Sequence, residues 1–249
     1  MIRFIAFAAI SLSCFAGQVI IPAGKFTMGR TKVTADDKTK MRPQVLLDDR
    51  PPHEVTISAF LLDDREVTHG KYAEFVAAKK HRAPYHWVDG KVPEELENVA
   101  VYNVSWDDAK AYCEFRGGRL PTEAEWERAA RGGLEQQSYP WGDKFDAKLL
   151  RSGVETGPAE VAKFPPNPFG LYDMAGNVAE WTADYFEREY YAHSPEVDPQ
   201  GPKEGIYRII RGGAWSDSTA RVTVFFRNWI GPKQRQPNVG IRCAKSEPK

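Results

Sequence analysis

The pattern of hydrophobic positions is most pronounced at the start of the chain. One basic residue, Arg3, precedes an apolar run over residues 4–15, and the small residues Cys14 and Ala16 flank its end. A short positive start, an apolar run and a small-x-small site are typical of a secretory signal peptide, and the run is too short to span a bilayer. We expect cleavage near Ala16, so that residues 1–16 are removed and the protein is exported to the periplasm or secreted. A buried N-terminal helix is the weaker alternative.

A lipid-modified Cys14 is a second alternative for this segment. Ser11 stands where a lipoprotein signal usually has leucine, and a lipid on Cys14 would leave only a few residues before the first predicted strand. Signal cleavage therefore explains the pattern better than lipidation does. The sequence predicts no transmembrane segment.

The remaining pattern alternates between short strands and short helices. Residues 19–21 and 24–29 predict two strands around a Pro-Ala-Gly turn, and residues 53–60 alternate like one half-buried strand. Residues 30–50 are polar and charged, which predicts a surface loop. A helix is expected from the N-cap Thr68 to about Lys80.

Two capping boxes predict two further helices. Ser105 with Asp108 opens the first, and Thr122 with Glu125 opens the second, which should end at Gly132. Beyond residue 133 the chain shows turns and short apolar pieces without helical periodicity. We therefore expect an α+β domain with little regular structure, spanning residues 17–249 without an internal boundary.

Composition narrows the class of protein. The chain has 249 residues with 34 basic and 34 acidic side chains, so it lacks the basic surplus that nucleic-acid binding requires. Hydrophobic residues make up 42% of the chain, which is enough for a core. Twenty glycines and 18 prolines agree with a loop-rich fold.

Removal of the signal peptide would leave two cysteines, Cys113 and Cys243. In an exported chain this suggests one disulfide, and two unpaired buried thiols are the alternative. A metal site made from these two residues alone is not expected, because neither has a second Cys or His at ligand spacing.

Several ordered segments resemble one family. They are Phe26–Gly29, Glu66–Thr68, Asn103–Trp106, Ala111–Cys113, Gly118–Glu127, Tyr139–Gly142, Phe169–Val178, Glu180–Thr182, Arg211–Gly213 and Val239–Cys243. Together they resemble the formylglycine-generating enzyme (sulfatase-modifying factor) family along nearly all of the mature chain. The resemblance implies an irregular C-type-lectin-like fold and a disulfide between Cys113 and Cys243.

The chemistry typical of this family is missing. Its members oxidise a cysteine of a sulfatase with two active-site cysteines that hold copper, a metal that soft thiolates select. By resemblance those positions fall on Asp217 and Val222, and no cysteine lies between Cys113 and Cys243. Copper is therefore not an expected cofactor.

Calcium is the cofactor that the resemblance implies. The family has two structural calcium sites, and one of them corresponds to Asn177, Val178 and Glu180, which offer the hard oxygen ligands that Ca²⁺ prefers. The alternative is a turn in which Asn177 caps the backbone and Glu180 pairs with an arginine. The resemblance places the asparagine position of the second site near Lys148, so we expect that site to be degraded.

A candidate pocket surrounds the replaced copper positions. Its residues are Trp215, Asp217, Ser218, Arg221, Arg227 and Trp229. The arginines suit a carboxylate or phosphate and the tryptophans an aromatic wall, although each residue has an ordinary structural alternative. His81 and His86, in a loop with Tyr85 and Trp87, are a further candidate for metal or ligand binding, with two solvent-facing histidines as the favoured alternative.

Two functions from different classes remain open. The first is an exported modifying enzyme for a peptide or small substrate; one group of relatives without the cysteine pair acts on a peptide siderophore precursor. The second is a non-catalytic lectin-like module that binds an exported protein, a peptide or a glycan. Formylglycine generation with a different ligand set is a third, less favoured hypothesis.

Overall fold

The computed structural model describes residues 17–32 and 48–247. The predicted signal peptide and residues 33–47 of the predicted surface loop lie outside these ranges. None of the helices in the described ranges is both long and apolar enough to cross a membrane.

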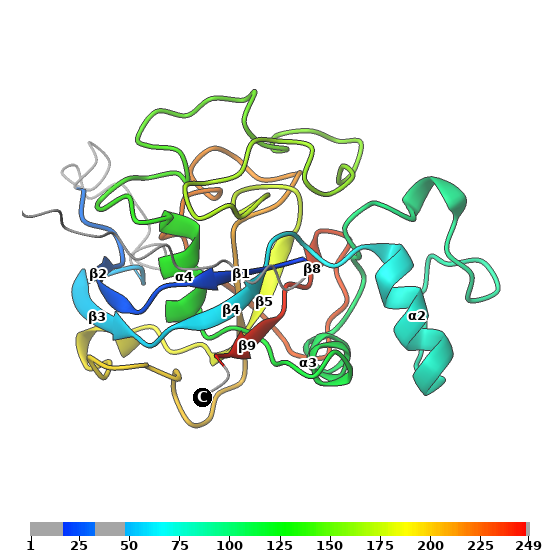
Figure 1. Cartoon of the computed structure of the whole chain (residues 1–249), viewed down its shortest axis with the longest axis horizontal. Coiled ribbons are helices and arrows are strands. Elements are labelled where there is room, and N and C mark those ends of the chain that lie inside the picture. Colours follow the sequence, from blue (N-terminus) through cyan, green and yellow to red (C-terminus); the bar gives the residue numbers. More distant parts are fainter. Residues whose placement is uncertain (1–16, 33–47, 248–249) are drawn as a thin grey trace, which may run out of the picture.

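Five strands near the two ends of the chain form two small sheets. β1 (Gln18–Ile21), β4 (Phe60–Asp63) and β9 (Ala244–Ser246) make a three-stranded antiparallel sheet, and β2 (Gly24–Met28) pairs with β3 (His53–Ile57). The predicted strands over residues 19–21 and 24–29 are confirmed. Because β9 lies beside β4, the last described residues close onto the first strands (Figure 1).

The strand predicted over residues 53–60 is in fact two strands in different sheets. β3 ends at Ile57 and β4 begins at Phe60. Between them, the Ser58 amide and hydroxyl both donate to the Asp198 carboxylate, at 2.7 and 2.6 Å. These bonds to a distant loop replace ladder hydrogen bonds, so the chain leaves one sheet and enters the other.

A four-stranded sheet forms the other half of the molecule. Its strand order is β7 (Asn228–Ile230), β6 (Arg208–Arg211), β5 (Ala179–Tyr185) and β8 (Val239–Gly240). Only the β5–β8 pair is parallel. Residues 132–178 connect the last helix to this sheet without a named helix or strand, and they form loops over one side of the molecule (Figure 1).

The three predicted helices are confirmed. They are α2 (His69–Lys79), α3 (Trp106–Phe115) and α4 (Glu123–Arg131), and two 3₁₀ turns, Glu94–Leu96 and Tyr190–Ala192, complete the helical structure of the described residues. Thr68 caps α2, and both predicted capping boxes form. Gly132 ends α4 at φ 58°, a left-handed conformation that glycine adopts without strain.

Both described ends of the polar segment 30–50 are less exposed than predicted. Arg30 and Asp49 are buried and form an ion pair through two hydrogen bonds, and Asp48 is also buried. Arg30 also lies over the Phe225 ring, 4.4 Å from its centroid. The described ends of this segment therefore belong to the packed interior, because each charge has an opposite charge or an aromatic face beside it.

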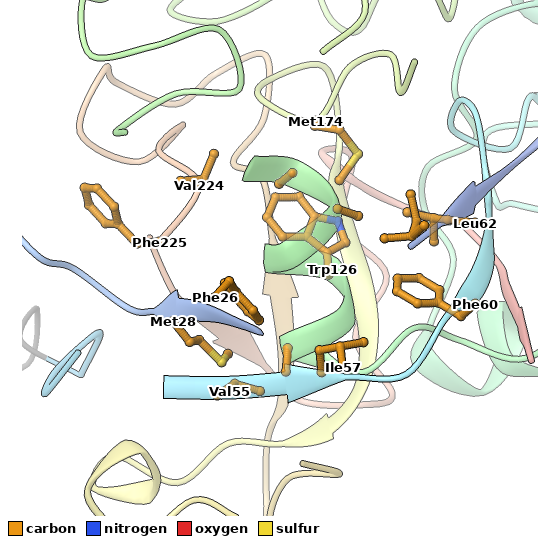
Figure 2. Packing of buried hydrophobic residues seen from close by; sticks show 14 of the residues in the cluster. Phe26, Met28, Val55, Ile57, Phe60, Leu62, Trp126, Met174, Val224 and Phe225 are labelled. Carbon is orange, nitrogen blue, oxygen red and sulfur yellow. The ribbon is translucent and has the colours of Figure 1, made fainter. Parts of the chain in front are cut away.

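The main core surrounds the indole ring of Trp126 on α4. Figure 2 shows this ring between residues of β2 to β4 and the loop residue Met174. A second cluster joins α2 and α3 to the four-stranded sheet and includes Trp181 and the two cysteines. Because Trp126 also donates a 2.6 Å hydrogen bond to Glu180 of β5, it connects the main core to the sheet of the second cluster.

The disulfide between Cys113 and Cys243 is present. It joins α3 to the residue that precedes β9, across a sequence separation of 130 residues. The Cys243 amide also donates to Asp63 of β4. The C-terminal strand β9 is therefore held both by the disulfide just before it and by its backbone hydrogen bonds to β4.

Replacing both cysteines by serine should lower the free energy of unfolding by about 4–5 kcal/mol, because the unfolded chain regains the entropy of a long open loop. Urea titration of the oxidised wild type and the double variant measures this loss. Reductant should destabilise the wild type by the same amount and leave the variant unchanged. Equal stability of the two proteins would contradict the prediction.

Candidate functional site

Helix α4 is buried along its whole length although most of its residues are charged. All nine residues from Glu123 to Arg131 are buried, and five of them carry a charge. Ionised side chains enter a protein interior only when they are paired and hydrogen-bonded. The partners of this helix therefore decide which segments pack around it.

Two arginines from a distant segment supply these partners. Arg211 bonds Glu123 at 3.0 Å and Glu127 at 2.6 Å, and Arg227 bonds both oxygens of Glu123 at 2.7 and 3.0 Å. Arg131, one turn after Glu127, completes the network at 2.6 Å. Because Arg211 and Arg227 stand at the two ends of residues 212–226, the network fixes both ends of the candidate pocket segment.

Glycines shape the turn that follows Arg211. Gly213 has a φ of 66°, and a Cβ atom there would lie 2.6 Å from the Arg221 carbonyl oxygen. The backbone of residues 213–221 therefore closes on itself in a way that only glycine permits.

The two positions that the resemblance assigned to the copper cysteines, Asp217 and Val222, have structural roles in this turn. The Asp217 carboxylate accepts a hydrogen bond from the Ala214 amide at 3.0 Å and lies 3.4 Å from Arg221. Val222 is completely buried in a small cluster with Tyr139 and Leu150. A carboxylate that caps a turn and a buried valine cannot supply the soft ligand pair that Cu(I) prefers.

The structure brings together four of the six predicted pocket residues. Trp215, Asp217, Ser218 and Arg221 share the turn; Ser218 and Arg221 are exposed, and Trp215 is half-buried. The Trp215 indole donates to the Pro237 carbonyl, and its amide donates to the Asn177 carbonyl at 2.8 Å. This turn therefore presents an aromatic and a cationic side chain next to the segment proposed for calcium.

The other two predicted residues lie apart from the turn. Arg227 is fully buried against Glu123 and over the Tyr191 ring. Trp229 on β7 stacks on Phe186, with centroids 3.9 Å apart. Arg227 therefore clamps an internal carboxylate, which the sequence could not reveal because Glu123 lies 104 residues away.

The segment from Asn177 to Glu180 packs against Glu66, a residue that sequence reasoning treated only as part of a family motif. The Asn177 amide group and the Val178 amide both donate to the Glu66 carboxylate. The Asn177 oxygen accepts from the Ala159 amide, and Glu180 pairs with Arg242 at 2.7 Å. This is the capped turn with an arginine pair that was the alternative to calcium.

The charges around this turn are nevertheless unbalanced. Glu66, Asp173 and Glu180 interact with one another and with the fully buried guanidinium of Arg242, and Asp173 also interacts with the partly exposed Arg65. Burial, followed by repulsion from Asp173 and Glu180, holds the pKa of Glu66 well above its usual value. Burial likewise raises the pKa of Asp173. An additional cation would relieve this repulsion.

The donor chemistry of this cluster suits a hard cation. It consists of carboxylate, amide and backbone carbonyl oxygens, and a cavity of about 360 Å³ lined by Glu66, Asp64 and Lys71 opens beside it. Within the described ranges, no group of three or more His, Cys, Asp and Glu side chains forms a metal site by itself. A calcium site here would therefore depend on the amide and carbonyl oxygens as well.

The two histidines of the 81–87 loop have different partners. His81 bonds Asp108 at 2.8 Å, whereas His86 bonds Asn103 at 3.0 Å and stacks on Tyr102. The imidazole nearest to His86 is that of His69 at the start of α2, with centroids 5.1 Å apart. The histidine expected beside His86 was His81, but the one found there is His69. The start of α2 lies beside this loop only in the folded chain, so the sequence could not reveal this neighbour.

The chain is similar to known proteins over most of its length. Residues 10–247 match the family model described as the Sulfatase-modifying factor enzyme 1-like domain. The chain is 34% identical to the formylglycine-generating enzyme of Streptomyces coelicolor, over 92% of this chain and 88% of the relative. It is 33% identical to the inactive C-alpha-formylglycine-generating enzyme 2 of Bos taurus, over 91% and 87%.

A solved structure with the same architecture is that of PvdO from Pseudomonas aeruginosa. It superposes with a TM-score of 0.77 at 27% identity, over 92% of this chain and 94% of that chain. The irregular α+β fold implied by the family resemblance is thereby confirmed.

Replacing Glu127 by Gln should destabilise the protein by about 3–5 kcal/mol, because Arg211 and Arg131 then keep buried charges without a full counter-charge. The matched control is Glu114→Gln, an exposed residue of α3 whose pair with Lys110 is long at 3.5 Å. The control should change the free energy of unfolding by less than about 0.5 kcal/mol. Equal losses in the two variants, measured by urea titration, would contradict the role given to the buried network.

Proposed function

Because the chain belongs to the sulfatase-modifying factor enzyme family, we propose that it is an exported, divergent member of that family. Its proposed activity is the modification of a peptide or a small substrate without a copper–thiolate site. Export rests on the signal-peptide pattern of residues 1–16 and agrees with the disulfide, since disulfides persist in oxidising compartments.

One observation carries this proposal: the family fold is retained while the copper positions are occupied by groups that cannot replace thiolates. Asp217 caps its own turn, Val222 is buried, and Cys113 and Cys243 are joined to each other. Function therefore has to be assigned from the side chains of the turn rather than from the family's usual reaction.

The turn favours a substrate with an aromatic or an anionic group. Trp215 offers a half-buried ring, Arg221 an exposed guanidinium and Ser218 an exposed hydroxyl. An arginine binds carboxylate and phosphate oxygens through charge-assisted hydrogen bonds.

A second candidate function is a non-catalytic binding or accessory module. The observation that favours it is that two of the polar candidate residues already bond other groups of the protein. Asp217 accepts a hydrogen bond from the Ala214 amide, and Arg227 is bound to Glu123. The similarity to a relative described as inactive points in the same direction. In that case the turn would hold a peptide, a glycan or an exported protein without changing it.

We also propose one structural calcium ion, held by the side-chain oxygens of Asn177 and Glu180 and the carbonyl oxygen of Val178, with Glu66 beside them. The carboxylates around Arg242 outnumber its single positive charge, which favours the binding of a cation. The donors are oxygen atoms, which favours calcium among the metals. Since the Trp215 amide donates to the Asn177 carbonyl, the ion would also stiffen the turn that presents Trp215.

The activity is tested by incubating small amounts of periplasm-expressed protein with exported peptides and small molecules of the source organism. Mass spectrometry should reveal a substrate that changes mass over many turnovers. Trp215→Ala should slow this change at least about tenfold, a loss of about 1.4 kcal/mol in the barrier. Trp141→Ala, which alters a partly exposed tryptophan on another loop, should leave the rate unchanged.

The other hypotheses predict different outcomes in this experiment. Stoichiometric binding without a mass change would replace the enzyme by the binding module. Copper-dependent conversion of a peptide cysteine to formylglycine would refute the proposal that the chain lacks the family's usual reaction.

Calcium should raise the melting temperature of protein freed of metal with a chelator. A concentration about 100 times the Kd contributes about 2.7 kcal/mol of stability, which is about 5–10 °C for a domain of this size. Asn177→Ala should abolish the calcium-dependent shift, whatever its effect on stability without metal. Glu94→Gln, an exposed residue of a 3₁₀ turn, should keep the shift. An unchanged melting temperature of the wild type in calcium would refute the site.

A further inference from the structure

A group of aromatic and polar side chains lies where the start of α2 meets the loop of residues 81–103. We call it the two-histidine cup, and its members are His69, Tyr85, His86, Trp87, Tyr102 and Asn103. It contains no residue of the turn around Trp215 or of the segment proposed for calcium. The inference drawn from it is independent of the proposed function.

The protonation of His69 follows from its neighbour Trp87. The indole Nε1–H of Trp87 can only donate, and it lies 2.9 Å from His69 Nδ1. Nδ1 is therefore the unprotonated nitrogen, and neutral His69 carries its proton on Nε2. His69 is fully buried, and its Nε2 atom has no hydrogen-bond partner. The cup thus contains one buried N–H donor without an acceptor.

His86 presents a second donor of the same kind. The Asn103 amide nitrogen donates to His86 Nδ1 at 3.0 Å, while the Asn103 oxygen accepts from the Tyr85 hydroxyl at 2.6 Å. The proton of neutral His86 is therefore on Nε2, which is also buried and without a partner. The His69 and His86 rings are nearly perpendicular, and both contact Tyr102.

Both imidazoles are neutral around pH 7. Burial, and then repulsion from His86, lowers the pKa of His69 to about 3. Burial, and then the nearby Arg235 guanidinium, lowers the pKa of His86. Of the charged groups near the loop, Arg235 is the one that acts on His86. Arg82 and His81 are bonded to Asp108, and the loop also carries Asp89, Lys91, Glu94, Glu95 and Glu97.

These features define the chemistry of a ligand. A transition metal needs a nitrogen lone pair, and both Nε2 atoms carry a proton instead. A buried donor without an acceptor is unfavourable, so a ligand that supplies an acceptor to both donors would be stabilised. The Arg235 guanidinium near His86 favours an anionic acceptor over a neutral one.

We propose that His69 and His86 bind a carboxylate group through their two Nε2–H donors. The ligand would enter past His86 and Tyr102, which are half-buried, and Tyr85, whose exposed fraction is 64%. A free short-chain carboxylic acid and the C-terminus of a peptide share this chemistry, and the test below distinguishes them.

The probe is sodium acetate, added at neutral pH to the full protein with ¹⁵N-labelled histidines. Acetate should shift the imidazole Nε2 resonances of His69 and His86 along a saturable curve, whereas sodium chloride at equal ionic strength should not. His86→Gln should weaken acetate binding at least about tenfold, the loss of one hydrogen bond to a charged group. His193→Gln, which changes an exposed histidine elsewhere, should bind acetate like the wild type.

A peptide with a free C-terminus, compared with its amidated form, identifies the source of the carboxylate. Tighter binding of the free peptide than of acetate assigns the cup to peptide ends, and weaker binding assigns it to small acids. Resonances that respond equally to acetate and chloride, or to neither, would overturn the proposal and leave buried water as the acceptor. A saturable shift with Zn²⁺ would also overturn it, because the Nε2 atoms would then carry lone pairs.

Discussion

The buried ion pairs of helix α4 are the constraint on which the rest of this structure depends. Glu123 and Glu127 cannot remain ionised in the core without Arg211, Arg227 and Arg131. The pairs made by Arg211 and Arg227 join elements far apart in sequence, so the helix, the sheet and the segment between these two arginines must assemble together. Hydrophobic residues pack around Trp126 (Figure 2), and the charged pairs specify which segments meet at this helix.

This arrangement separates the scaffold from the chemistry of the turn. Arg211 and Arg227 fix the ends of residues 212–226 through groups that lie outside the exposed part of the turn. The exposed side chains of the turn, such as Ser218 and Arg221, can therefore differ without loss of the fold.

The region near the proposed calcium site is also connected to distant segments, including the turn, by buried polar contacts. Glu180 accepts from Trp126 of α4 and pairs with Arg242, which precedes the disulfide-bonded Cys243. The Asn177 carbonyl accepts from the Trp215 amide. Glu66 is therefore connected to the Trp215 backbone through Asn177.

The sequence by itself determined the local elements and the family. Thr68, the two capping boxes and Gly132 specified the helix ends, because a cap bonds backbone groups within three residues of itself. Alternating apolar positions likewise indicated β2 and β3, and the collinear motifs identified the family over residues 10–247.

Only the tertiary structure decided where charged side chains lie. The sequence of α4 is polar enough for a surface helix, yet the whole helix is buried, and Arg227 is bound to Glu123 rather than exposed in a pocket. It also decided that His86 lies beside His69 and that residues 53–60 divide between two sheets. The physical reason is that a charge or an imidazole is stabilised by whatever partner lies within a few ångströms, and the partners here are brought together by folding from distant parts of the chain.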